Sequence, residues 1–203
     1  MIWEGLNPPY RTIVADPPWD YPEGFATQSR TPGKWAGAVR TQSLPYSSMS
    51  VDDIATMPVE ELSDRDCRLF LWATNRYLPD SLSIVAEWGF RYRQLLTWHK
   101  LDGLGGSVAP NSEFMVVAVK GSPSRLSRAP AAVICHAQAK AHSVKPEEFR
   151  DLIETVSPGP YVELFARQPR LGWDHWGYGY ELAGSTETRE PEPKTETKGT
   201  PCL

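Results

Sequence analysis

Residues 10–21 read YRTIVADPPWDY, and this stretch decides how the rest of the chain is interpreted. The run RTIVA predicts a short buried strand. The strand ends at Asp16, because two consecutive prolines, Pro17 and Pro18, cannot continue a β-ladder. An acidic side chain, followed closely by Trp19, therefore stands directly beyond the carboxyl end of a strand. This is where open α/β sheets bind their ligands.

Strands and helices are predicted to alternate along the rest of the chain. Apolar runs favour strands, and apolar residues at helical spacing favour helices. The expected strands are 67–73, 91–98, 113–119, a short piece at 131–135, and 160–166. The expected helices are 51–55, 59–62, 79–88 and a last one that opens at 145–148 and runs to about 156. This alternation predicts an α/β fold with a mostly parallel sheet.

Size and composition favour one globular domain. The chain has 203 residues, of which 40% are hydrophobic and 23% charged. We expect the domain to span residues 1–182. The Thr-, Glu-, Lys- and Pro-rich stretch 183–203 is expected to be a disordered tail.

Targeting signals and cysteine usage indicate a cytoplasmic protein without a membrane partner. No apolar run approaches the roughly 18 residues that cross a bilayer. The first residues lack the basic and apolar regions of a signal peptide. The three cysteines are far apart and form no CxxC pair, so no disulfide framework is expected.

The net charge of −4 argues against a general polyanion binder, but the charge is unevenly distributed. Residues 24–51 and 114–146 contain no acidic side chain. Basic residues in these two stretches are candidates for binding phosphates: Arg30, Lys34, Arg40, Lys120, Arg125 and Arg128. Two solvated loops would produce the same pattern, and composition alone leaves both interpretations open.

The four residues Asp16 to Trp19 suit the recognition of an exocyclic amine such as adenine N6. The lone pair of that nitrogen is delocalised into the ring, so the amine is a poor nucleophile. A carboxylate (Asp16) and a rigidly held carbonyl (Pro17) that accept its two N–H groups would return electron density to the nitrogen. Trp19 would stack on a base taken out of its helix. The alternative is a strand-ending turn with a buried tryptophan.

The same segment resembles the catalytic segment of the MT-A70 family of adenine-N6 methyltransferases. Further segments resemble the family's motifs in the family's order, and the similarity covers residues 10–180. These segments are LPY at 44–46 with MS at 49–50, LFLW at 69–72 with TN at 74–75, WGF at 88–90, WHK at 98–100, HSVKPE at 142–147, and ELFAR at 163–167 with GW at 172–173 and WG at 176–177.

The resemblance implies a Rossmann-like methyltransferase fold with helices on both faces of the sheet, and S-adenosylmethionine as the cofactor. The residues that it implies around the target amine and base are Asp16, Pro17, Pro18, Trp19 and Tyr46. Those that it implies around the cofactor are Asp16, Lys145, Glu163, Phe165, Arg167 and Tyr178. Lys145 would meet the cofactor's carboxylate, and Glu163 and Arg167 its ribose and neighbouring groups. Tyr178 stands where the family often carries Asn.

Strand alternation agrees with part of this assignment. In an extended segment, Glu163, Phe165 and Arg167 share one face with Tyr161. A glutamate in an otherwise apolar strand is costly to bury unless it is paired, and ribose hydroxyls or Arg167 would serve. The four histidines show no metal-ligand spacing, so no metal is expected.

We expect DNA as the substrate, because the chain is short and resembles the stand-alone forms of the family found in bacteria and phages. The same reaction on RNA stays open. A catalytically idle subunit that binds nucleic acid or a partner enzyme is a further alternative, and a homo- or hetero-oligomer is compatible with all three. Idle members usually lose the DPP carboxylate or the cofactor residues, whereas this chain keeps Asp16, Lys145, Glu163 and Arg167.

Overall fold

The computed structural model describes residues 2–21, 48–100, 111–127, 133–136 and 145–177, and only the backbone of 133–136. The proposed domain end at 182 and the expected tail at 183–203 lie outside these residues. None of the helices in the described ranges is long and apolar enough to cross a membrane.

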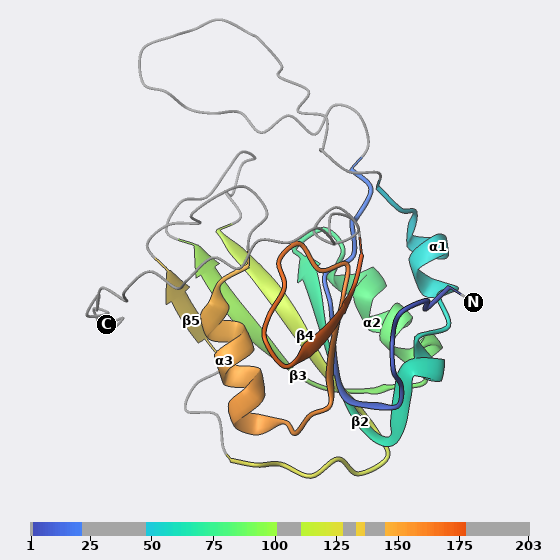
Figure 1. Cartoon of the computed structure of the whole chain (residues 1–203). Coiled ribbons are helices and arrows are strands. Elements are labelled where there is room, and N and C mark those ends of the chain that lie inside the picture. Colours follow the sequence, from blue (N-terminus) through green and yellow to red (C-terminus); the bar gives the residue numbers. More distant parts are fainter. Residues whose placement is uncertain (1, 22–47, 101–110, 128–132, 137–144, 178–203) are drawn as a thin grey trace, which may run out of the picture.

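The described strands form one seven-stranded sheet in the order β5-β3-β4-β2-β1-β6-β7 (Figure 1). Every neighbouring pair is parallel except the two that involve β4, which runs antiparallel to both β2 and β3. The strands are β1 (Tyr10–Ala15), β2 (Ser63–Thr74), β3 (Arg91–Lys100), β4 (Ser112–Lys120), β5 (Val133–His136), β6 (Tyr161–Leu164) and β7 (Trp173–Trp176). The predicted α/β class with a mostly parallel sheet is confirmed. The reversed direction of β4 and the edge strand β7 were not predicted.

Helices cover both faces of the sheet, as expected. One face is covered by α1 (Val51–Ala55), the 3₁₀ helix η1 (Val59–Leu62) and α2 (Leu78–Glu87), and the other by α3 (Glu147–Val156). Helix α1 begins at the predicted N-cap, where the Ser50 hydroxyl accepts a hydrogen bond from the Asp53 N–H at 3.1 Å. After α2 the chain turns at Gly89, whose φ of +79° is easily reached only by glycine.

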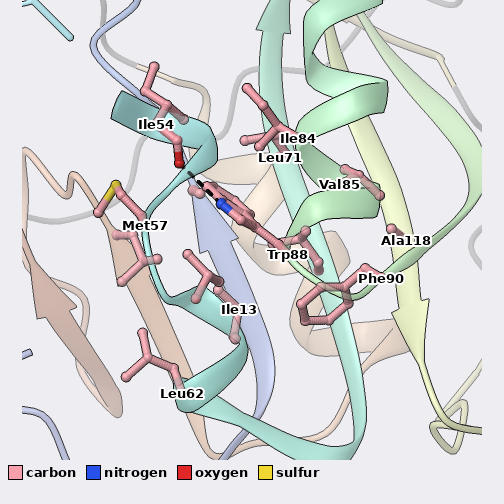
Figure 2. Packing of buried hydrophobic residues seen from close by; sticks show 14 of the residues in the cluster. Ile13, Ile54, Met57, Leu62, Leu71, Ile84, Val85, Trp88, Phe90 and Ala118 are labelled. Atoms are coloured by element: carbon pink, nitrogen blue, oxygen red, sulfur yellow. Dashed lines mark hydrogen bonds between the residues drawn. The ribbon is translucent and has the colours of Figure 1, made fainter. Parts of the chain in front are cut away.

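Strand alternation divides the core into two clusters. In β2, Leu69 and Leu71 face α1 and α2, whereas Phe70 and Trp72 face α3. The larger cluster surrounds Trp88, which is fully buried and donates its indole N–H to the Ile54 carbonyl at 3.1 Å (Figure 2). This hydrogen bond ties α1 to the end of α2 and leaves no polar atom of that indole unsatisfied.

The sheet topology brings chemically active residues to one edge. Strands β1, β2, β3 and β6 run in the same direction, so their carboxyl ends meet there. Strand β4 runs the other way and begins at this edge, where Glu113 pairs with Thr74 of β2. The residues before α3 reach the same edge. We call it the carboxyl edge, and all the groups described next lie along it.

Candidate active site

Asp16 follows β1 directly and is held between two cations. Its side chain is 8% exposed. Oδ1 lies 3.0 Å from Lys145 Nζ, and Oδ2 lies 3.5 Å from Arg167 Nη2. Its backbone N–H donates to the Leu164 carbonyl at 3.3 Å, which fixes the residue against β6. The structure therefore brings together three residues, far apart in sequence, that the resemblance implied.

Lys145 is the centre of a longer chain of charges. Its ammonium lies 3.2 Å from Glu113 Oε2 and 5.2 Å from the centre of the Trp72 ring, and Glu113 in turn accepts a hydrogen bond from Lys100. We name this set, Lys100–Glu113–Lys145–Asp16–Arg167, the charge relay row. It alternates in sign, so each buried charge has opposite charges as neighbours, as burial of ions requires.

The pKa directions in the row follow from this arrangement. Burial alone would lower the pKa of Lys145, but the carboxylates of Asp16 and Glu113 outweigh it and raise that pKa. Burial alone would raise the pKa of Glu113, but Lys145 and Lys100 outweigh it and lower that pKa. Both groups are therefore charged at neutral pH. Glu113 was not identified from the sequence, and only its position at the start of a strand otherwise made of apolar residues signalled it.

Glu163 is paired with an arginine that the sequence analysis missed. Arg150 of α3 donates from Nε to Glu163 Oε2 at 2.9 Å and from Nη2 to Oε1 at 3.0 Å, a bidentate contact. The expected partner, Arg167, binds Asp16 instead. Burial raises the pKa of Glu163, and Arg150 partly opposes this effect. Arg150 was predictable only by asking which residue of the α3 helix faces β6.

The strand that carries Glu163 is shorter than predicted. Strand β6 ends at Leu164, and Phe165 has a φ of +62°, a conformation that costs energy for a bulky side chain. The ring of Phe165 joins the cluster on the α1 and α2 face and meets Trp176 edge-on at 5.5 Å. Strand alternation therefore fails beyond Glu163, and the expected shared face of Phe165 and Glu163 is wrong.

Trp19 has a different position from the one predicted. Its ring stacks on Tyr77, with centroids 4.9 Å apart and planes at 11°, and is only 4% exposed. Its indole N–H donates to the Trp72 carbonyl at 3.3 Å. The expectation that this ring stacks on a target base does not fit, because the ring is buried in the core. The backbone N–H of Trp19 donates to the Pro17 carbonyl at 2.9 Å, which closes the turn.

A cleft at the carboxyl edge joins these groups. It is lined by Asp16, Lys145, Arg150, Glu163, Phe165, Arg167 and Gln168. The lining combines two buried carboxylates, three cations and an aromatic ring. Such a set suits a ligand that carries a carboxylate, hydroxyl groups and a flat ring.

The family model of MT-A70 matches residues 10–179, almost the whole described chain and more than four-fifths of the sequence. The chain belongs to the MT-A70 family. The confirmed membership agrees with the ordered motifs and with the Rossmann-like fold.

Individual MT-A70 relatives and similar enzymes cover most of this chain. The type II methyltransferase M.MunI of a Mycoplasma species is 29% identical over 178 residues, which are 83% of this chain and 76% of that protein. The N(6)-adenosine-methyltransferase MT-A70-like protein of Drosophila melanogaster is 30% identical over 185 residues, 86% of this chain but only 27% of that protein. The human N(6)-adenosine-methyltransferase catalytic subunit METTL3 is 27% identical over 185 residues, which are 86% of this chain and 28% of that protein.

A second arginine fixes the segment of this MT-A70 chain that follows Arg167. Arg170 binds three acids on the surface of α3: Glu147 at 3.0 Å, Asp151 at 2.7 Å and Glu154 at 2.7 Å. Trp173 adds a hydrogen bond to Glu154 at 2.7 Å. Helix α3 therefore holds both Glu163, through Arg150, and the loop after β6, through Arg170.

Two of the predicted phosphate-binding residues lie away from the cleft. Lys120 ends β4 and is paired with Glu60 at 3.0 Å and with the Ser63 hydroxyl at 2.9 Å. The seven residue steps from Glu113 to Lys120 span roughly 23 Å of strand. Arg125 follows at the same far edge. Lys120 and Arg125 therefore lie away from the cleft, and their binding of phosphates stays a prediction.

The remaining predicted site residues lie outside the described part of the chain. They are Arg30, Lys34, Arg40, Tyr46, Arg128 and Tyr178. Within the described part, no group of three His, Cys, Asp or Glu side chains could hold a metal ion.

Proposed function

We propose that this chain transfers a methyl group from S-adenosylmethionine to N6 of adenine in DNA. Adenine-N6 methyltransferase activity follows from membership in the family, since the relatives carry that activity in their names. The observation that carries the proposal is Asp16, a buried carboxylate that lies between Lys145 and Arg167, directly precedes Pro17 and lines the cleft.

The chemistry of the cleft fits the proposed cofactor. S-adenosylmethionine supplies an electrophilic methyl group, and it also carries a carboxylate, ribose hydroxyls and an adenine ring. In this proposal Lys145 binds the carboxylate, and Arg167 and Glu163 bind the ribose and neighbouring groups. Each oxygen of Glu163 accepts one hydrogen bond from Arg150 and keeps a lone pair for a ribose hydroxyl. Phe165 offers a ring beside them.

Asp16 and Pro17 perform the activation of the target amine in this proposal. Their oxygens accept the two N–H groups of N6, which increases the electron density on the nitrogen and aims its lone pair. Bound S-adenosylmethionine would supply the methyl group, which this nitrogen would displace from sulfur. Asp16 is placed to accept the proton that the amine then releases. The protein thus contributes positioning and electrostatics rather than a covalent intermediate.

The similarity to the type II methyltransferase M.MunI supports DNA as the substrate, and it extends over 83% of this chain. The N6-adenosine enzymes match the chain at a comparable identity. RNA remains the second candidate because the similarity to those enzymes extends over 86% of this chain. The intact charge relay row argues against an idle subunit. A partner subunit is compatible with the name of METTL3, which calls it a catalytic subunit.

The test is methyl transfer to matched substrates. Purified protein is incubated with S-adenosylmethionine and with duplex DNA, single-stranded DNA or RNA of the same sequence, and N6-methyladenine is quantified by mass spectrometry after digestion to nucleosides. Asp16→Asn keeps the shape of the side chain but removes its charge, and we expect roughly 100- to 1,000-fold less product. Asp52→Asn, on the exposed surface of α1, is the matched control with unchanged activity.

The outcomes separate the alternatives. Product on DNA alone supports the proposal, and product on RNA alone keeps the chemistry but replaces the substrate. No product and no binding of S-adenosylmethionine by calorimetry would favour the idle subunit. An Asp16→Asn variant as active as Asp52→Asn would refute the role given to the carboxylate.

A further inference from the structure

Tyr21 is an aromatic residue at the site whose ring is fixed in place and yet open to solvent. Its hydroxyl donates to Thr74 Oγ1 at 2.8 Å, and its ring meets Tyr77 edge-on with centroids 5.4 Å apart. The residue is nevertheless 37% exposed. Tyr77 thus lies between two aromatic neighbours: Trp19, buried on its face, and Tyr21, exposed at its edge.

The position of Tyr21 places this exposed ring at the rim of the charge relay row. Thr74, which holds the hydroxyl, pairs directly with Glu113 across β2 and β4. Burial raises the pKa of Tyr21, and the charges of Glu113 and Lys145 shift that pKa in opposite directions. Both charges therefore lie near the phenol. The ring stands on the β2 and β4 side of Asp16, opposite the β6 side that holds Glu163.

Other exposed large apolar residues of the described ranges lie elsewhere. Tyr92, 49% exposed, is the other aromatic one, and it lies near the start of β3. It lies eight residue steps from Lys100 at the carboxyl edge, or roughly 26 Å of strand. Among the described aromatic residues, Tyr21 is therefore the one with an exposed ring at the carboxyl edge, close to Glu113 and Lys145.

We propose that a nucleobase of the substrate stacks on the ring of Tyr21 as its strand enters the Asp16 cleft. This inference rests on the proposed function, because it assumes a nucleic-acid substrate. A base brought out of its helix loses stacking, and a ring that is already oriented restores it at a small entropic cost. Trp19 cannot supply this surface, since Tyr77 and the core cover it. Tyr21 therefore takes the stacking role that the sequence assigned to Trp19.

The experiment compares three single variants with the wild-type chain. Tyr21→Leu removes the aromatic ring, Tyr21→Phe keeps the ring but loses the hydrogen bond to Thr74, and Tyr92→Leu is the matched exposed tyrosine far from the site. The probes are a fluorescently labelled 40-base-pair DNA duplex, its single strand and the RNA of the same sequence. Dissociation constants are measured by anisotropy with S-adenosylhomocysteine present, and KM and kcat are measured on whichever probe is methylated.

Stacking of one base on an aromatic side chain predicts a loss of roughly 5- to 150-fold in substrate affinity for Tyr21→Leu. The same factor should appear in KM. We expect Tyr21→Phe to stay within about threefold of wild type, because the ring alone carries the interaction. Tyr92→Leu should bind as wild type does. Binding of S-adenosylmethionine, measured by calorimetry, should be equal in all four proteins and reports that each is folded.

Specific results would overturn the inference. Equal substrate affinity of Tyr21→Leu and Tyr92→Leu would do so, and so would a loss in Tyr21→Phe as large as in Tyr21→Leu, which would assign the effect to the hydroxyl. Wild-type protein that binds none of the three probes would also overturn it. Methylation by the wild-type chain is scored separately, so a failure of the proposed function is distinguishable from a failure of the Tyr21 inference.

Discussion

The two faces of the sheet differ in the side chains that they bury. The face under α1 and α2 is an apolar cluster around Trp88, whose polar atom is satisfied within the cluster (Figure 2). The face under α3 is apolar at its centre, around Phe149, but at the carboxyl edge it carries the buried charges of Asp16 and Glu163. The first face supplies area removed from water, and the second supplies charges that are held in position.

This difference predicts which substitutions should change stability alone and which should change both stability and ligand binding. Of the described residues in the apolar cluster on the α2 face, only Phe165 also lines the cleft. Changes elsewhere in that cluster should therefore alter the free energy of unfolding and leave ligand binding per folded molecule intact. The charges on the α3 face hold one another, and changes there should alter both. The predictions below test this division.

The largest loss of stability is expected from Trp88→Ala. The substitution removes a fully buried indole from the centre of the α2-face cluster, together with its hydrogen bond to the Ile54 carbonyl. Truncation of such a side chain costs about 4 kcal/mol. The measurement is urea unfolding followed by circular dichroism. Ile84→Val, a smaller change in the same cluster, should cost about 1 kcal/mol and keeps the comparison possible if Trp88→Ala does not fold.

Cofactor binding distinguishes this result from a change in the site. The Ile84→Val protein should bind S-adenosylmethionine with wild-type affinity. A clear loss of affinity in this folded variant would show that the two faces are coupled.

The next largest effect is expected from Arg150→Met on the α3 face. The substitution removes the Arg150 guanidinium and leaves Glu163 as a buried carboxylate with no bidentate partner. This should lower the free energy of unfolding by about 3 kcal/mol at neutral pH. Cofactor affinity should fall as well, because Glu163 loses its orientation. Arg150→Lys should restore part of the stability but less of the affinity, since an ammonium cannot hold both oxygens.

The sign of the pH dependence follows from the pKa of Glu163. That pKa is raised above its ordinary value of 4.5 by burial, and loss of Arg150 removes the main opposing effect. A raised carboxyl pKa means that the folded state binds more protons, so stability is lost as pH rises above about 4.5. The deficit of Arg150→Met relative to wild type should therefore shrink between pH 7 and pH 5. An unchanged deficit would mean that Glu163 does not carry the effect.

The sequence predicted the framework of this site but not its connections. The strand before Asp16 could be predicted because its apolar run and the two prolines are local signals. The partner of Glu163 could not, because α3 and β6 meet only after folding. Arg150 has no motif of its own, and Arg167 was the nearer cation in the chain. The direction of β4 also depends on the whole sheet, and it brings Glu113 to Lys145.

Trp19 and Phe165 show a second limit of sequence reasoning. Trp19 belongs to the motif, which suggested contact with substrate, yet local turn geometry directs its ring onto Tyr77. Phe165 breaks the alternation of β6 because its φ is positive. The backbone there also packs closely against Gly177, since a Cβ on Gly177 would lie 2.5 Å from the Phe165 Cα. Neither the turn that orients Trp19 nor the positive φ of Phe165 can be predicted from the alternation of apolar and polar residues.

A smaller effect is expected from Glu113→Gln within the charge relay row. The amide keeps the shape of the side chain but loses the charge that binds both Lys100 and Lys145. We therefore expect the free energy of unfolding to fall by about 2 kcal/mol at pH 7. The pKa of Glu113 is lowered in the folded state, so its stabilisation is present above about 4.5 and is lost as pH falls below that value. Wild type and variant should therefore converge in acid. Parallel stability curves from pH 7 to pH 3 would contradict the ion pairs.

The smallest effect is expected at the far edge of the sheet, from Lys120→Ala. The lysine and its partner Glu60 are both partly exposed, so their ion pair is screened by water and contributes less than about 1 kcal/mol. A double-mutant cycle with Glu60→Ala measures that coupling directly. Lys120→Ala should also leave the affinity for each nucleic-acid probe unchanged, because Lys120 lies a full strand from Asp16. A fall in affinity comparable to that of Tyr21→Leu would instead extend the substrate path along the whole length of β4. Substrate binding would then not be confined to the carboxyl edge of the sheet.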